Sequence, residues 1–285
     1  MRKGEPLLAF FGHHKCASSY ISDIICCAAR EVGLHGASVT TPATFGHDLN
    51  RWVQDHNLDL LVYRMSDYEY VKKLREFKGL HVIRDPRDVV VSAYFSHLYS
   101  HPIEGIPVIA GLRERLQNLS EEDGLLLEMD SREQQFKCMA GWDYSLPNML
   151  EIKYEDLVRN PYQHFLDMFR FLGLLDGEKY SLRKRTVHFI YRGLRSLEDR
   201  SERRVSIPVF PQRLTAERLL GIVWENDFSK KAGGRMLGQE DVRHHYRKGV
   251  PGDWRRYFSE RHVTRFKELY NPLLVKLGYE QDANW

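Results

Sequence analysis

The chain has 285 residues, of which 28% are charged and 42% are hydrophobic, an ordinary balance for a globular protein. A net charge of +3 is too small to indicate a nucleic-acid partner by itself, and no apolar run reaches the length of a membrane span. The four cysteines lack zinc-ligand spacing, and the first strand begins too early to leave room for a signal peptide. We therefore expect reduced thiols, no membrane span and a cytoplasmic location.

The first predicted elements are a strand over Leu7–Phe11, a tight loop that begins at Gly12, and a helix. The apolar residues of this helix share one face: Ile21, Ile24, Ile25 and Ala28. Lys15, Ser18 and Ser19 stand where the helix begins, and exposed N–H groups and the helix dipole favour an anion there. The order of residues differs from the G-x-x-x-x-G-K-[ST] signature, so the loop predicts a phosphate site without the usual ATP and Mg²⁺ arrangement.

Further strands are predicted over Leu58–Arg64, Leu80–Arg84 and Met149–Tyr154, and they alternate with helical segments. This alternation is typical of a parallel sheet with crossover helices. Two of the helix starts are clear from the sequence, because Asp85-Pro86 and Asn160-Pro161 each place an N-cap residue before a proline.

Arg84 marks a second anion site, at the carboxyl end of its predicted strand. Ligands bind at the carboxyl ends of strands in open α/β sheets, and an arginine there can hold a phosphate through two hydrogen bonds. Ser92, two helical turns further on, offers another donor. The alternative is that Arg84 pairs with Asp85 or Asp88 and only orders the turn.

A third basic segment lies near the C-terminus, where Arg247-Lys248-Gly249 precedes Gly252-Asp253-Trp254. Two adjacent cations beside glycines can wrap a terminal phosphate, because glycine lets the backbone approach closely. Taken alone, such a turn is more typical of an ordinary surface.

Together these segments resemble the nucleotide-dependent sulfotransferases, in particular the cytosolic type. His14–Ile21 is similar to the family's 5′-phosphosulfate loop, Val82–Ser92 to its 3′-phosphate strand and helix, and Arg247–Trp254 to its R-K-G-x-x-G-D-W motif. Lys153–Leu157 with Asn160-Pro161 is similar to another recurring segment. The resemblance runs in family order over nearly the whole chain.

The resemblance implies one α/β domain over residues 1–285, with a mainly parallel sheet flanked by helices and a P-loop-like nucleotide-binding architecture. It also implies the donor 3′-phosphoadenosine 5′-phosphosulfate (PAPS), the product 3′-phosphoadenosine 5′-phosphate (PAP), and no metal, since fixed cations would replace Mg²⁺. The 5′ end of the donor would lie against Lys15, Cys16, Ala17, Ser18 and Ser19. The 3′-phosphate would lie against Arg84, Ser92, Arg247, Lys248 and Gly249, and the adenine against Tyr20, Tyr154 and Phe228.

The chain departs from the family pattern in two places. Cys16-Ala17 stands where the family has Ser/Thr-Gly, and alanine can replace glycine only where the backbone angle φ is negative. Met65 stands at the usual place of the general-base histidine. Sulfuryl transfer still needs a group that takes the acceptor proton. The candidate bases are first His47, then Asp48 and Asp67, and after these the histidines His13, His14, His97 and His101.

The expected function is therefore sulfuryl transfer from PAPS to a hydroxyl group of a small molecule, a sugar or a carrier-bound acceptor. Two alternatives remain open: a donor-binding but catalytically silent regulatory protein, and a P-loop kinase that uses ATP, which the order of the loop residues disfavours. The basic stretch 183–204 is either a solvated surface or a docking face for an acidic carrier protein. The family's usual dimerisation segment is not reproduced, so the oligomeric state stays open.

Overall fold

In the computed structural model, which describes residues 5–176 and 213–285, five strands form one sheet. The strands are β1 (Leu7–Phe11), β2 (Gly36–Val39), β3 (Leu60–Tyr63), β4 (Phe77–Ile83) and β5 (Met149–Lys153). Their order is β2-β3-β1-β4-β5, and every neighbouring pair runs parallel. The parallel α/β fold expected from the sequence is therefore confirmed.

One strand, β2, has no counterpart among the predicted ones. Its sequence Gly-Ala-Ser-Val lacks an apolar alternation, and Val39 is its only buried residue. The segment becomes a strand because its backbone pairs with β3 at the edge of the sheet. The other strands lie close to the predicted positions, although β4 begins at Phe77, before the predicted start at Leu80.

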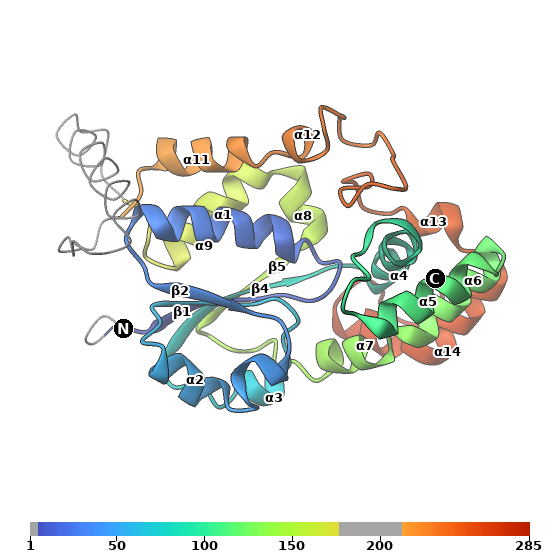
Figure 1. Cartoon of the computed structure of the whole chain (residues 1–285), viewed down its shortest axis with the longest axis horizontal. Helices are drawn as coiled ribbons and strands as arrows, with labels where there is room; N and C mark the ends of the chain where they lie inside the picture. Colours follow the sequence, from blue (N-terminus) through green and yellow to red (C-terminus); the bar gives the residue numbers. More distant parts are fainter. Residues whose placement is uncertain (1–4, 177–212) are drawn as a thin grey trace.

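Helices cover both faces of the sheet (Figure 1). The helices α1 (Ser18–Glu31), α9 (Pro161–Phe171) and α11 (Ala216–Glu225) pack on one face, with α8 (Tyr154–Arg159) beside them. The predicted apolar face of α1 is buried there: Ile21, Ile24, Ile25 and Ala28. The 3₁₀ turn η1 (Pro42–Phe45) and the helices α2 (Leu49–Asp55) and α3 (Tyr68–Val71) lie on the opposite face, over a second apolar cluster.

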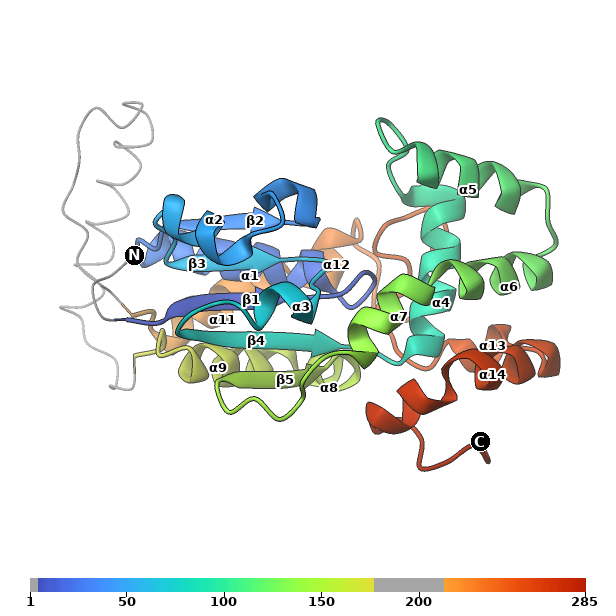
Figure 2. The same ribbon diagram turned by 90° about the horizontal axis from the view of Figure 1, so that it is seen from below.

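The remaining helices form a helical lobe beyond the carboxyl ends of the central strands (Figure 2). They are α4 (Pro86–Phe95), the π-helical turn η2 (Ser96–Ser100), α5 (Pro107–Gln117), α6 (Glu121–Ser131), α7 (Glu133–Ala140), α13 (Trp254–Tyr257) and α14 (Glu260–Lys276). A third apolar cluster joins these helices. The short helix α12 (Phe228–Lys231) precedes the loop that leads into this lobe.

Both predicted helix starts are present. The Asp85 carboxylate caps α4, with Pro86 at its first position, and the Asn160 side chain caps α9 in the same way. In the two described ranges, no helix combines the length and the apolar character that crossing a membrane requires. The basic stretch 183–204 lies outside the described residues.

Candidate functional site

The loop after β1 is fixed to the carboxyl edge of the sheet by backbone hydrogen bonds. The Gly12 N–H donates to the Tyr63 carbonyl at 2.9 Å, and the Gly12 carbonyl accepts from the Ser66 N–H at 2.8 Å. A side chain at Gly12 has no room, because its Cβ would lie 2.4 Å from Ser18 Oγ. Gly12 therefore lets the loop pack closely against Ser18, the first residue of α1.

The start of α1 has the properties of an anion site. Ala17 is the N-cap residue, and within the described part of the chain no side chain caps the first N–H groups of the helix. The Ser18 hydroxyl donates to the His13 carbonyl at 2.8 Å and so holds the turn. N–H groups left open at a helix N-terminus attract phosphate.

Ala17 has a left-handed backbone, with φ 61° and ψ 21°. The negative φ that alanine prefers is therefore absent, and the residue has the conformation that favours the family's glycine. A left-handed conformation costs a residue with a Cβ about 1–2 kcal/mol. The loop retains its shape in spite of this substitution, and Ala17 is a strained position.

Lys15 lies among other cations. Burial, together with the charges of Arg84 and Arg247, lowers the pKa of Lys15 to about 7, while Glu128 opposes this shift. Positive charges that are brought together repel one another, and an anion placed among them relieves the repulsion. Lys15 and the two arginines come from three separate segments, and all three were expected to contact the donor.

Arg84 connects two of these segments. Its Nη1 donates to the Lys15 carbonyl at 3.1 Å, and its guanidinium lies 4.4 Å from the centre of the Tyr154 ring. The Nη2 atom is 3.9 Å from Asp88, whereas Asp85 pairs with Arg87 instead. Among the described residues, the buried Nε of Arg84 has no hydrogen-bond partner. Arg84 thus has a donor left over, which would suit a phosphate.

The C-terminal basic segment is tied to the start of α4 by Asp88. The Asp88 carboxylate accepts from the Gly252 N–H at 2.6 Å and from the Trp254 N–H at 2.9 Å. The neighbouring Asp253 carboxylate accepts from Arg247 and Lys248, at 2.5 Å each. These contacts hold the two cations beside the carboxyl end of β4.

Aromatic residues lie beside the cationic segments. Gly249 has φ 74°, and a Cβ there would lie 2.7 Å from ring carbons of Phe228, so the glycine is needed for this close approach. Burial raises the pKa of Tyr20, and the neighbouring Asp227 and Tyr154 raise it further. The Tyr20 ring packs against Phe165, and the Tyr154 ring lies under the Arg84 guanidinium, so the adenine contacts of Tyr20 and Tyr154 stay a prediction.

The other predicted donor contacts differ in how exposed they are. Cys16 is fully buried in the apolar cluster of the helical lobe, and burial raises the pKa of its thiol to about 12. Its side chain thus faces the protein core, and only its backbone remains for a ligand. Ser19 and Ser92 are half-buried, in the first turn of α1 and the second turn of α4.

The three leading base candidates have local structural roles. Asp48 caps α2 by accepting from the Arg51 N–H at 3.0 Å, and Asp67 caps α3 by accepting from the Glu69 N–H at 2.9 Å. His47 is exposed, and its Nδ1 lies 3.0 Å from the Tyr70 hydroxyl. His47 and Asp48 follow β2, and Asp67 follows β3, so all three lie in segments at the carboxyl edge of the sheet. Their role as the general base stays a prediction.

A buried polar chain below the loop was not foreseen from the sequence. His13 Nε2 and His81 Nε2 are 2.8 Å apart, and His81 Nδ1 is 2.7 Å from Glu151 Oε2. Burial lowers the pKa of His81 to about 3 and raises the pKa of Glu151 to about 8. The Glu151 carboxyl is therefore largely protonated at neutral pH and donates to the neutral imidazole. His81 lies on β4, Glu151 on β5 and His13 in the loop after β1, and the sequence contains no local pattern that predicts contacts between these segments.

Comparisons with known proteins identify a family and a shared fold. The sulfotransferase domain family matches residues 69–278, well over half of the chain. A sequence comparison with curated proteins gives no match. Mouse sulfotransferase SULT7A1 complexed with PAP has a TM-score of 0.55 and 16% identity, over 98% of this chain and 87% of that one. Retinol dehydratase in a complex with retinol and PAP has a TM-score of 0.48 and 14% identity, over 94% of this chain and 80% of that one.

At 16% identity the mouse structure establishes a shared fold alone. The family match begins at residue 69, so it includes the segments of Arg84 and Arg247 but not the loop of Lys15. The match over residues 69–278 shows that the chain belongs to the sulfotransferase domain family of enzymes.

Proposed function

We propose that this protein transfers a sulfuryl group from PAPS to a hydroxyl group of an acceptor. The observation that carries the proposal is the convergence of Lys15, Arg84 and Arg247 at the carboxyl edge of the sheet. Arg84 donates to the Lys15 carbonyl, and the charges of both arginines lower the pKa of Lys15. A nucleotide with a phosphate at both ends of its ribose would place one anion at the start of α1 and another between Arg84 and the Arg247–Gly249 segment.

The open N–H groups of α1 support the 5′ assignment, together with Lys15, Ser18 and Ser19. The unpartnered Nε of Arg84 supports the 3′ assignment, because the donor differs from ordinary adenine nucleotides in its 3′-phosphate. Tyr20, Tyr154 and Phe228 would contact the adenine. The mouse relative was solved with PAP, which agrees with the same class of ligand.

Lys15 would stabilise the departing phosphate. As the acceptor oxygen bonds to sulfur, the bond from sulfur to the bridging oxygen breaks, and negative charge develops on the 5′-phosphate. Burial keeps the pKa of Lys15 near 7, so part of the lysine is neutral until an anion arrives. The bound phosphosulfate would restore the full charge where the reaction requires it.

The acceptor class remains broad: a small molecule, a sugar or a carrier-bound intermediate with a free hydroxyl. We also propose that residues 1–285 form one sulfotransferase domain, since the helical lobe and the sheet both contribute to the donor site.

A binding panel followed by turnover tests the proposal. We expect PAP to bind at least about tenfold more tightly than adenosine 5′-monophosphate, and far more tightly than ATP with Mg²⁺. Radiolabelled PAPS should then lose its sulfuryl group to members of a panel of phenols, alcohols and sugars. Tight PAP binding without any release of PAP from PAPS would favour the catalytically silent protein, which the methionine at position 65 suggests. Preference for ATP with Mg²⁺ would favour a kinase.

A further inference from the structure

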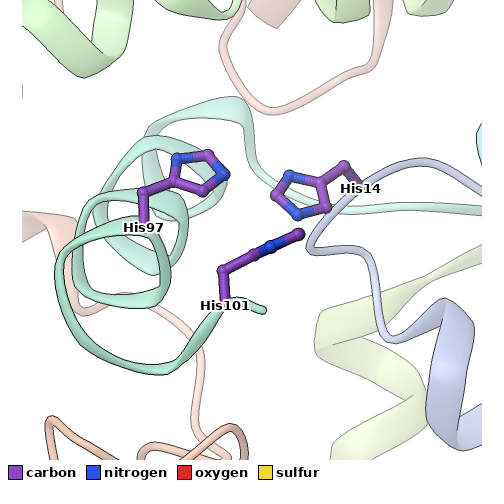
Figure 3. Close-up of side chains that lie close together, drawn as sticks. All are labelled: His14, His97 and His101. Carbon is purple, nitrogen blue, oxygen red and sulfur yellow. The ribbon is translucent and has the colours of Figure 1, made fainter. Parts of the chain in front are cut away.

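Three histidines come together next to Lys15. His14 belongs to the loop after β1, while His97 and His101 belong to η2 and the residue that follows it. One ring nitrogen from each histidine lies within 4.8 Å of those of the other two, and Figure 3 shows the rings converging on one space. The His14 ring is stacked on the His97 ring with centroids 5.3 Å apart, and the His101 ring centroid is 5.8 Å from that of His14. The π-helical turn η2 carries His97, and His101 directly follows it; such turns are frequent at functional sites.

The hydrogen bonds of His101 leave one nitrogen free to accept a proton. Its Nδ1 is 2.7 Å from the Pro102 carbonyl oxygen, and a carbonyl can only accept, so this nitrogen carries the hydrogen. In the neutral ring, Nε2 of His101 therefore holds the lone pair. His101 is half-buried, so a ligand can reach it, whereas only 1% of His97 is exposed.

His97 and His14 have supporting contacts from Glu128 of α6 and from Arg132, the residue that follows α6. The Nδ1 of His97 is 2.9 Å from Glu128, which is fully buried and also pairs with Arg132 at 2.9 Å. The Nδ1 of His14 is 3.2 Å from Nη1 of Arg132, and a guanidinium can only donate. His14 therefore carries its hydrogen on Nε2, which makes the ring a donor toward the shared space.

The ring contact with His14 places His101 beside one of the donor-binding segments, the loop after β1. His14 directly precedes Lys15, and the charge of Lys15 lowers the pKa of His14. Burial lowers the pKa of His245 to about 4, and the charges of Lys15 and His101 both contribute. His245 stands just before the Arg247–Gly249 segment. The His14–His101 ring contact thus places His101 beside the loop that carries Lys15.

We propose that His101 is the general base that takes the proton of the acceptor hydroxyl, with His97, Glu128 and His14 as positioning residues. This inference rests on the proposed sulfuryl transfer. The acceptor oxygen forms its bond to sulfur while its proton passes to Nε2 of His101. The bond from sulfur to the bridging oxygen breaks, and the electron pair leaves with the 5′-phosphate beside Lys15. Met65, at the family's usual place for the base, has no atom that could accept this proton.

The surroundings determine the charge state of the cluster. Burial lowers the pKa of His14 and of His97, which favours the neutral form of both rings. The carboxylate of Glu128 offsets the charge of Arg132. Among the described residues, the titratable and charged groups around His101 come from every element packed against it: His14 and Lys15 of the loop, His97 of η2, Arg113 of α5, Glu128 of α6, Arg132 between α6 and α7, and His245.

The test compares the full-length wild type with His101→Gln and His101→Asn. The assays use PAPS with 2-naphthol, with 4-nitrophenol, which is already largely ionised at about pH 8, and with water as the acceptor. We expect both variants to lose about 100-fold or more in kcat with 2-naphthol and with water, because a general base contributes about 10²–10⁴-fold. The loss with 4-nitrophenol should be small, and the Kd for PAP should be unchanged. A residue that only supports the fold would not show this dependence on acceptor ionisation.

Control variants locate the effect. His56→Gln changes an exposed histidine on the far side of the sheet and should leave every activity unchanged. His97→Gln should lower kcat less than His101→Gln and should shift the pH profile, because it removes the link to Glu128. His47→Ala, Asp48→Asn and Asp67→Asn are measured in the same series.

The outcomes separate the two proposals. Wild-type protein that binds PAP but never releases it from PAPS would overturn sulfuryl transfer itself. An active wild type with equally active His101 variants would overturn only the base assignment, as would a full loss confined to His47→Ala, Asp48→Asn or Asp67→Asn. Elemental analysis provides the last arm, because one tightly held zinc ion per chain would mean that the three histidines are metal ligands and not a base.

Discussion

Arg84 donates a hydrogen bond to the carbonyl oxygen of Lys15 over 3.1 Å. This contact joins the end of β4 to the loop after β1, so the two ends of the proposed donor site cannot move independently. The guanidinium also covers the Tyr154 ring at 4.4 Å, which fixes its plane. Arg84 thereby connects the proposed 5′-phosphate site, the proposed 3′-phosphate site and the Tyr154 ring.

Replacing Arg84 should therefore weaken the binding of a 3′-phosphate. A charge-assisted hydrogen bond contributes about 1.5–3 kcal/mol, so Arg84→Ala should lower the affinity for PAP by about 10- to 100-fold. The affinity for adenosine 5′-monophosphate should change much less. Isothermal titration calorimetry measures both ligands, and Arg75→Ala, an exposed arginine, is the matched control. If Arg84→Ala still prefers PAP by the wild-type factor, the 3′ assignment is wrong.

Lys15 should make PAP binding depend on pH. Its pKa is near 7 in the free protein, and a bound phosphate should raise it, so the complex holds more protons than the free protein. Affinity should therefore fall by about tenfold or more between about pH 7 and about pH 9, a range in which the PAP phosphates no longer titrate. Calorimetry in two buffers of different ionisation enthalpy should detect proton uptake.

The control for this prediction is Lys15→Arg. An arginine stays charged over the whole range, so this variant should bind PAP with a nearly flat pH profile. A wild type with the same flat profile would show that Lys15 is already fully charged before PAP binds.

The strained residue Ala17 predicts a stabilising substitution. Glycine adopts φ 61° without strain, and the relief of about 1–2 kcal/mol is partly offset by the flexibility of glycine in the unfolded chain. Ala17→Gly should therefore raise the free energy of unfolding by about 0.5–1 kcal/mol in urea titrations. Ala29→Gly in the interior of α1 is the matched control and should lower it by about 1 kcal/mol. A destabilised Ala17→Gly would contradict the left-handed conformation.

Arg87 should matter for stability and not for chemistry. Its guanidinium is 4.0 Å from the Trp254 ring and 4.5 Å from the Trp285 ring, and it donates to Asp85 and to Glu280 at 2.8 and 2.6 Å. Arg87→Ala leaves a buried carboxylate without its partner, so we expect a loss of about 3–5 kcal/mol in the free energy of unfolding.

Chemical denaturation measures this loss against Arg261→Ala. Arg261 pairs with Asp123 at 2.8 Å on the surface, and such exposed pairs contribute about 0–1 kcal/mol. Equal effects of the two substitutions would mean that the buried arginine does not hold the C-terminal segment to α4.

The parts of the fold that could be predicted are those with local signals. The apolar run before Gly12 and the Asp85-Pro86 pair each specify an element through their own residues. The strand β2 could not be predicted, because Gly36–Val39 has no apolar alternation and depends on pairing with β3. The left-handed backbone of Ala17 is likewise imposed by the loop around it.

The donor site was more predictable than the proton acceptor. Lys15, Arg84 and Arg247 stand in segments whose spacing resembles a family, so their convergence could be expected. The meeting of His14 with His101 depends on the packing of η2 against the first loop, which no local pattern encodes. Histidines are also common in this sequence, so spacing alone could not single out one of them.

The structure of the full chain with PAP bound is the most direct test of the donor site. We expect the 5′-phosphate within about 3 Å of the Lys15 amine and of the first N–H groups of α1, and the 3′-phosphate at the same distance from the Arg84 guanidinium. PAP bound in the reverse direction, or away from the carboxyl edge of the sheet, would contradict the assignment of both phosphates.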